Sequence, residues 1–66
     1  MRYPYYPDIR VSTESTNSWV LVARVRQELR RKRAPKSEID RFTAEALERD
    51  DPSWQTEVCQ HWVIVA

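Results

Sequence analysis

The order of apolar and polar residues along the chain predicts five short elements. Residues 8–14 alternate β-branched or apolar side chains with polar ones, a period of two that is typical of a half-buried strand. Residues 18–33, 38–49 and 52–61 instead repeat apolar side chains at helical spacing, as amphipathic helices do. The apolar and β-branched end of the chain, residues 62–66, predicts a second strand.

Local signals indicate where the first two helices begin and end. Asn17 or Ser18 is a good N-cap for the first helix, and Pro35 ends that helix by disfavouring helical geometry in the residue before it. Ser37 and Asp40 form a start signal for the second helix. The connection between the two helices is short, so we expect them to be neighbours in a hairpin.

These elements predict an α+β fold of order β-α-α-α-β, with residues 1–66 forming a single domain. The third helix starts after a capping residue, Asp51, with Pro52 at its first position. An isolated pair of strands is marginally stable, so the terminal strands must pair and pack beside the helices. The expected core consists of Ile9, Val11, Leu21, Val22, Val25, Leu29, Ile39, Phe42, Leu47, Val58 and Trp62.

Residues 1–8 contain two prolines and three tyrosines, and we expect them to form an N-terminal arm. Proline favours extended geometry and interrupts a regular ladder. A tyrosine has an apolar body and a polar tip, so we expect this arm to pack its rings on the core. The alternative is an aromatic contact surface for a partner or for bases.

The small size and the composition exclude several classes of protein. A chain of 66 residues buries only about 60% of the surface that its unfolded form exposes, so small domains usually need a disulfide, a metal or a partner. One cysteine, Cys59, allows no internal disulfide, and one histidine, His61, leaves too few ligands for zinc. The absence of glycine excludes the glycine-rich phosphate-binding loops. We therefore expect no metal and no cofactor, and self-association remains as the stabilising device.

The sequence contains no catalytic motif, and we expect no enzymatic activity. Cys59 and His61 are two residues apart, and this spacing points them to different faces of a helix. Cys59 is expected to be a small buried apolar side chain. A lone thiol suits a reducing compartment, and no apolar stretch reaches the length of a signal peptide or a membrane span. These features predict a cytoplasmic location.

Charge is divided unevenly along the chain. Residues 1–36 carry nine Lys or Arg against three Asp or Glu, a net charge of +6, while residues 37–66 carry two against seven, a net charge of −5. Such a division creates a strong local field although the whole chain is +1. It favours an anionic partner for the first half, or a second copy of the chain arranged head to tail.

The candidate binding residues lie on and just after the first helix. Helical spacing places Arg26, Arg30 and Arg33 on one flank, with Trp19 at the same edge and Lys36 just beyond. Arg24 and Arg31 point to the opposite side. Of the three tryptophans, we expect two in the core and Trp19 partly exposed, where aromatic and arginine side chains are typical of protein interfaces.

The order of these signals resembles a group of very small uncharacterised proteins from bacteria and their phages. The resemblance covers residues 15–65 and consists of an Asn-led helix, a helix of the type E-I-x-x-F-x-x-E-A and a terminal Trp-Val. The matching positions are Asn17, Ala23, Val25, Leu29, Glu38, Ile39, Phe42, Glu45, Ala46, Asp50, Asp51, Trp62 and Val63. The chain departs from this pattern where residues 32–35 are Lys-Arg-Ala-Pro instead of containing Ala-Gly. The resemblance implies an accessory role, such as modulating a host protein.

The sequence thus leaves two hypotheses for function. The favoured one is a small non-catalytic binding protein that engages a protein partner, and a homodimer is expected beside it. The alternative is a nucleic-acid-binding protein that uses the basic first helix, because phosphate contacts need clustered Lys and Arg. A helix–turn–helix arrangement is excluded, since the second helix would have to enter the major groove and is mainly acidic.

Overall fold

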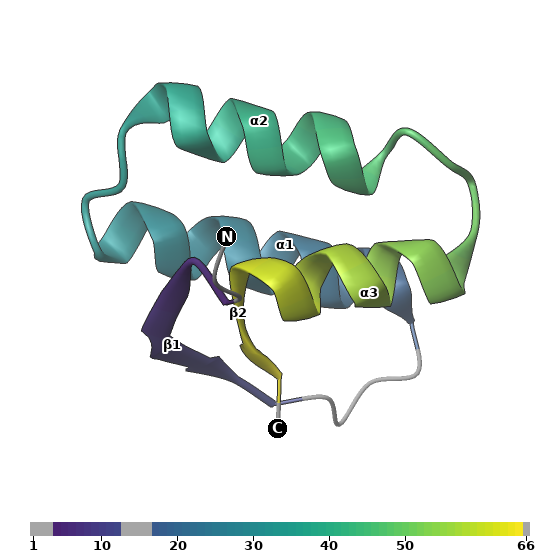
Figure 1. Cartoon of the computed structure of the whole chain (residues 1–66), viewed down its shortest axis with the longest axis horizontal. Helices are drawn as coiled ribbons and strands as arrows, with labels where there is room; N and C mark the ends of the chain where they lie inside the picture. The colour runs from purple at the N-terminus through teal and green to yellow at the C-terminus, as the bar shows by residue number, and fades with distance from the viewer. Residues whose placement is uncertain (1–3, 13–16, 66) are drawn as a thin grey trace.

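Three helices and a two-stranded sheet follow one another in the predicted order β-α-α-α-β. The computed structural model describes residues 4–12 and 17–65. Its elements are β1 (Tyr6–Val11), α1 (Ser18–Arg31), α2 (Lys36–Ala46), α3 (Pro52–Trp62) and β2 (Val63–Val65). Helices α1 and α3 lie under α2, and the sheet lies on the side of this helix pair that faces away from α2 (Figure 1).

The two strands of the sheet run parallel. The paired residues are Tyr6 with Val63, Arg10 with Ile64, and Val11 with Val65. Parallel neighbours require a long crossover connection, and here the three helices together form it. The register shifts between Tyr6 and Arg10, a stretch that contains Pro7, which has no N–H to contribute to the ladder.

Strand β1 begins two residues earlier than predicted, inside the segment that was expected to be an arm. It ends at Val11, while Thr13 and Glu14 of the predicted strand lie outside the described residues. Tyr5 and Tyr6 pack on Trp62, with ring centroids 4.9 and 6.1 Å from the tryptophan ring. For these two residues the expectation that the arm packs on the core is confirmed. Tyr3 lies outside the described residues.

The core lies where the three helices meet the inner face of the sheet. The buried apolar side chains are Ile9, Val11, Leu21, Val22, Val25, Leu29, Ile39, Phe42, Ala46, Val58, Cys59, Trp62 and Val63. Every predicted core residue except Leu47 is among them. Trp62 is buried and Trp19 is exposed, as predicted, whereas Trp54 is half-buried and packs against the core from its edge.

Helix α1 starts as predicted and ends two residues early. Asn17 caps it, because its Oδ1 accepts a hydrogen bond of 2.9 Å from the backbone N–H of Trp19. At the other end Arg33 adopts a left-handed conformation with φ of 60°, and Ala34 N–H donates to the carbonyl of Leu29 at 2.9 Å. This pattern is a Schellman ending, in which a left-handed residue closes the helix.

Helix α2 differs from the prediction at both ends. It spans Lys36–Ala46 instead of 38–49, and it begins without a side-chain cap, so the proposed start signal of Ser37 and Asp40 is wrong. The carbonyl of Pro35, whose backbone is extended, accepts the N–H groups of Glu38 and Ile39 instead.

Leu47 is the C-cap of α2 and is 45% exposed, so its placement in the core is wrong. The helix stops at Ala46, which is fully buried, and Leu47 turns away from the core with φ of −93° and ψ of 2°. The chain cannot remain helical for long after this point, because Pro52 disfavours helical geometry in Asp51.

Helix α3 starts as predicted. Asp51 accepts a hydrogen bond of 3.0 Å from Ser53 N–H, and Pro52 occupies the first turn. Gln55 is buried and accepts a hydrogen bond from the hydroxyl of Ser18, which joins the first turns of α1 and α3. Among the described residues, none of the helices has the length and apolar character that crossing a bilayer requires.

Candidate binding surface on helix α1

Helix α1 buries one stripe and exposes a basic outer surface. The buried residues are Ser18, Leu21, Val22, Val25 and Leu29, which recur at helical spacing. Arg24, Arg30 and Arg31 are exposed, and Arg26 is half-buried at the edge of the stripe. The packing of the core therefore determines which basic side chains face solvent.

Arg26 and Arg30 meet Lys36 at a pocket between α1 and α2, here named the α1–α2 pocket. Its volume is about 420 Å³, and the remaining lining residues are Ala34, Ile39 and Asp40. The early start of α2 matters for this site, since it puts Lys36 in the first helical turn. The structure thus brings together three of the five predicted binding residues.

Within the α1–α2 pocket, Arg26 has an unsatisfied hydrogen-bond donor. Its Nε is buried and has no hydrogen-bond partner in the described part of the chain. Leaving a buried donor unpaired costs about 1–3 kcal/mol. Because this Nε is closed to solvent, an oxygen that entered the pocket would reach it only after the Arg26 side chain moved.

The other two predicted residues lie outside the pocket. Trp19 is 53% exposed and precedes Arg26 by seven residues, so it lies on the same face of α1 about 10 Å away. Arg33 is exposed on the turn after α1, and its left-handed backbone closes the helix. Spacing along an ideal helix does not apply to Arg33, because the helix ends at Arg31.

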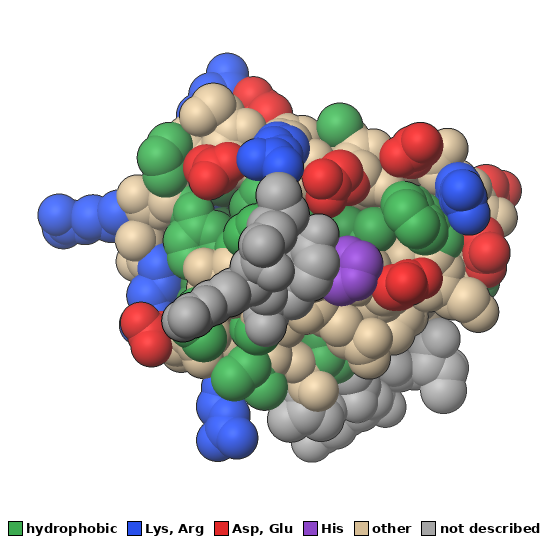
Figure 2. All heavy atoms as spheres, viewed as in Figure 1, with side chains coloured by type: hydrophobic (Ala, Val, Ile, Leu, Met, Phe, Trp, Pro, Cys, Tyr) green, Lys and Arg blue, Asp and Glu red, His purple; other side chains and the backbone are tan. Residues whose placement is uncertain are grey.

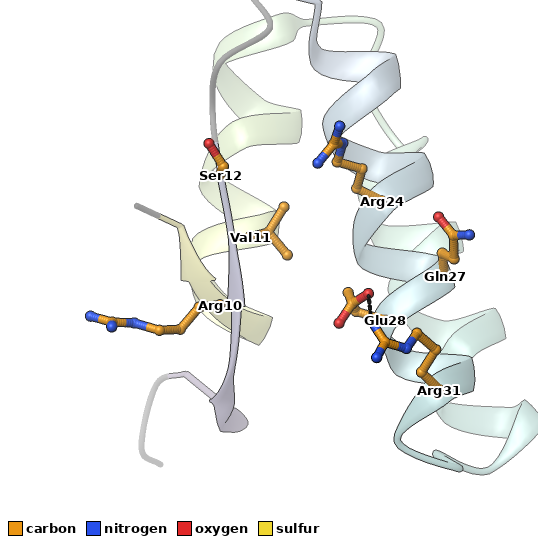
Figure 3. Close-up of a pocket in the computed structure, with 7 residues that line it drawn as sticks. All are labelled: Arg10, Val11, Ser12, Arg24, Gln27, Glu28 and Arg31. Carbon is orange, nitrogen blue, oxygen red and sulfur yellow. Dashed lines mark hydrogen bonds and ion pairs between the residues drawn. The ribbon is translucent and has the colours of Figure 1, made fainter.

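A second basic site, the α1–β1 groove, lies on the opposite flank of α1. It has a volume of about 430 Å³ and is lined by Arg10, Val11, Ser12, Arg24, Gln27, Glu28 and Arg31. Figure 3 shows Arg24 and Glu28 extending from α1 toward β1, while Arg10 extends away on the other side of the strand. Arg31 donates to the Glu28 carboxylate at 3.0 Å.

The sequence correctly separates Arg24 and Arg31 from the other flank, but it does not reveal this groove. Arg10 is not among the predicted binding residues. The sequence indicates only that Arg10 lies on the outer face of β1, because it alternates with buried residues. The packing of β1 beside α1 is a contact between distant segments, and hydrophobic periodicity does not predict such contacts.

Most basic side chains of α1 form no ion pair with the described residues. Arg31 is the one basic residue of α1 that forms an ion pair within residues 4–12 and 17–65. In Figure 2, Lys and Arg side chains project from the left end, where α1 joins α2, while Asp and Glu side chains predominate along α2 and at the opposite end, with some Lys and Arg among them. The uneven charge of the sequence is therefore also uneven in space.

Cys59, the one cysteine of the chain, is not placed to act as a nucleophile. Cys59 is fully buried, and this burial raises the pKa of its thiol to about 12, so the thiol is protonated and not nucleophilic at neutral pH. In the same residues no group of three or more His, Cys, Asp and Glu side chains is arranged to hold a metal ion. A further pocket, of about 250 Å³, is lined by Tyr5, Glu45, Glu48, Trp54, Val58 and His61, whereas the predicted binding residues gather on α1 and at the start of α2.

Comparison with known proteins gives no match: no family model, no curated protein and no solved structure is similar to this chain.

Proposed function

We propose that this protein is a small non-catalytic binding protein, and that it engages an acidic surface of a protein partner through Trp19 and the α1–α2 pocket. The observation that carries the proposal is the exposure of Trp19, 53%, on the same face of α1 as Arg26. Tryptophan and arginine are the residues that most often dominate the binding energy of protein interfaces. Arg30 and Lys36 add positive charge without a protein counterion in the described residues.

The chemistry of the pocket indicates what the partner offers. An Asp or Glu side chain that enters between Arg26 and Lys36 would meet the positive charge of both. An apolar side chain beside it would cover Trp19. The resemblance to small phage and bacterial proteins suggests a context for such a partner, namely a host protein whose activity the bound protein modulates in the cytoplasm.

Nucleic acid is the second candidate, and a specific observation favours it. Basic side chains occupy both flanks of α1, with Arg26 and Arg30 on one and Arg24 and Arg31 on the other. A helix that carries positive charge on both flanks suits a groove whose two walls are rows of phosphates. The protein candidate accounts better for the exposed tryptophan, which phosphate contacts leave unexplained.

Capture experiments with charge-reversed variants test the protein candidate. Tagged protein is incubated with lysate of the native host, and bound proteins are quantified. Arg26→Glu with Arg30→Glu, and separately Trp19→Ala, should remove the captured partner. Lys32→Glu with Arg49→Glu changes the formal charge equally, lies outside the pocket and should retain it. Equal loss or equal retention across these variants would refute the proposed surface.

A salt titration separates the two candidates. Labelled duplex and single-stranded DNA and RNA are titrated with the protein at low and moderate salt. Binding through several cations releases counterions and must weaken steeply as salt rises. At moderate salt we expect the unmodified protein to bind nucleic acid no more tightly than the variant with Arg26→Glu and Arg30→Glu does. Tight binding with a steep salt dependence would establish the nucleic-acid candidate in place of the protein partner.

A further inference from the structure

We infer that the α1–β1 groove receives an extended acidic segment of a protein partner, which adds a strand to the free edge of β1. This is a second site on the other flank of α1, and it does not depend on Trp19 or on the α1–α2 pocket. Three features carry the inference: an edge strand with no second strand beside it among the described residues, a groove along that edge, and arginines placed to meet carboxylates.

The first feature is the unpaired edge of β1. The sheet has two strands, so β1 pairs with β2 on one side only. Within the described part of the chain, residues 6–12 form no backbone hydrogen bond with anything except β2. A free edge presents backbone N–H and C=O groups that an extended peptide satisfies by strand addition.

The second feature is the position of the groove along this edge. Its walls include three consecutive residues, Arg10, Val11 and Ser12, whose side chains alternate between the two faces of the strand. A cavity that reaches all three follows the edge of the strand and not one of its faces. Figure 3 shows β2 on one side of β1 and the groove with α1 on the other.

The third feature is the charge of the groove. The groove is lined by three arginines, Arg10, Arg24 and Arg31, and by one acid, Glu28. The Glu28 carboxylate already forms an ion pair with Arg31. Arg24 has no ion-pair partner among the described residues and extends into the groove. In an added strand, alternate side chains would point toward α1 and away from it, so acidic residues on the face toward α1 would meet Arg24.

A labelled acidic peptide and its variants test both the strand addition and the requirement for acidic side chains. The probe is a fluorescein-labelled heptapeptide, Thr-Glu-Val-Glu-Val-Glu-Thr, and binding is followed by fluorescence anisotropy. Two further versions carry N-methyl groups on alternate amides, one version for each edge of the peptide. Strand addition uses one edge, so one N-methylated version should lose binding and the other should retain it. A peptide with Lys in place of each Glu should not bind.

Protein variants locate the site. Arg24→Glu with Arg31→Glu should weaken binding of the probe at least about tenfold, whereas Lys32→Glu with Arg49→Glu, of equal formal charge, should leave it unchanged. Circular dichroism melting confirms that each variant is folded. If Arg24→Glu with Arg31→Glu does not fold, Arg24→Gln alone should weaken binding by a smaller factor, and hydrogen exchange should show protection of the amides of residues 9–12 on adding the peptide.

Each contrary result overturns the inference. Equal binding of both N-methylated peptides would show attraction by charge alone, and absence of binding at millimolar peptide would show that the edge is closed. Loss of peptide binding in Arg26→Glu with Arg30→Glu, but not in Arg24→Glu with Arg31→Glu, would move the site to the other flank. The proposed function has its own readout, capture of the host protein, so the two can fail separately.

Discussion

At the residue scale, Trp62 links segments that are far apart in the sequence. Its ring contacts Tyr5 at 4.9 Å and Phe42 at 5.7 Å between centroids, both in edge-to-face geometry. Its Nε1 donates to the Glu45 carboxylate at 3.0 Å, which satisfies the one polar atom of a buried side chain. The last residue of α3 thereby holds the N-terminal segment and α2 together.

Phe42 is the central ring of α2 and is fully buried. Replacing it with Ala removes most of a large apolar side chain from a core that has little room to collapse. We expect Phe42→Ala to lower the free energy of unfolding by about 3–5 kcal/mol, close to the whole stability of a domain of this size. Urea denaturation measures this change. Leu47→Ala, at a site that is 45% exposed, should cost far less, and similar losses in the two variants would contradict the assignment of the core.

We expect the buried thiol of Cys59 to make the protein less stable at alkaline pH. Burial raises the pKa of the folded thiol from 9.0 to about 12, so between these values the unfolded chain releases a proton that the folded chain keeps. The free energy of unfolding should therefore be unaffected by Cys59 below pH 9 and should fall as pH rises above it, by up to about 1.4 kcal/mol per pH unit. Denaturation at neutral pH and near pH 10 measures the fall, and Cys59→Ala should reduce it. Parallel pH profiles for the two proteins would contradict this reasoning.

At the element scale, the ends of the helices were harder to predict than their existence. Asn17 and Asp51 were identified as caps because a short polar side chain before an apolar repeat has few other roles. Ser37 gave the same signal and is not a cap, since α2 starts one residue before it and the extended Pro35 provides the first carbonyl. The signal was ambiguous because a proline can end one helix and also stand at the start of the next.

Arg33 takes a backbone conformation that glycine normally supplies at the end of a helix. A left-handed residue with a Cβ costs about 1–2 kcal/mol relative to its right-handed form, and the chain contains no glycine. We expect Arg33→Gly to raise the free energy of unfolding by up to about 1 kcal/mol, measured by urea denaturation. Lys32→Gly, at a C-cap with negative φ, should give no gain. A loss of stability in Arg33→Gly would mean that the Arg33 side chain contributes more than its backbone costs.

At the scale of the whole molecule, the order of elements followed from periodicity, whereas the relative placement of the elements did not. Apolar spacing reported which face of each helix is buried, so Leu21, Val25 and Phe42 were placed correctly. The parallel orientation of the strands, the meeting of Lys36 with Arg26 and the groove beside Arg10 all depend on contacts between distant segments. One sequence without tertiary information has no local signal for such contacts.

The three-dimensional distribution of charge leads to a last prediction, on self-association. The basic turn between α1 and α2 and the acidic turn between α2 and α3 lie at opposite ends of the helical layer (Figure 1). In a two-fold dimer with the long axes antiparallel, each basic turn would face the acidic turn of the other copy. Exposed ion pairs contribute little, so the exposed apolar side chains Trp19, Val20 and Leu47 must supply most of the affinity. The dimer would therefore cover Trp19 and compete for it with the proposed protein partner.

We therefore expect light scattering at tens of micromolar to give twice the monomer mass. Trp19→Ala should shift the protein to the monomer, because this change removes the largest exposed apolar side chain. High salt alone should weaken the dimer only modestly, since it screens the facing turns but leaves the apolar contact intact. A monomer at every concentration would refute the dimer, and dissociation by salt without an effect of Trp19→Ala would assign its affinity to charge instead of apolar burial.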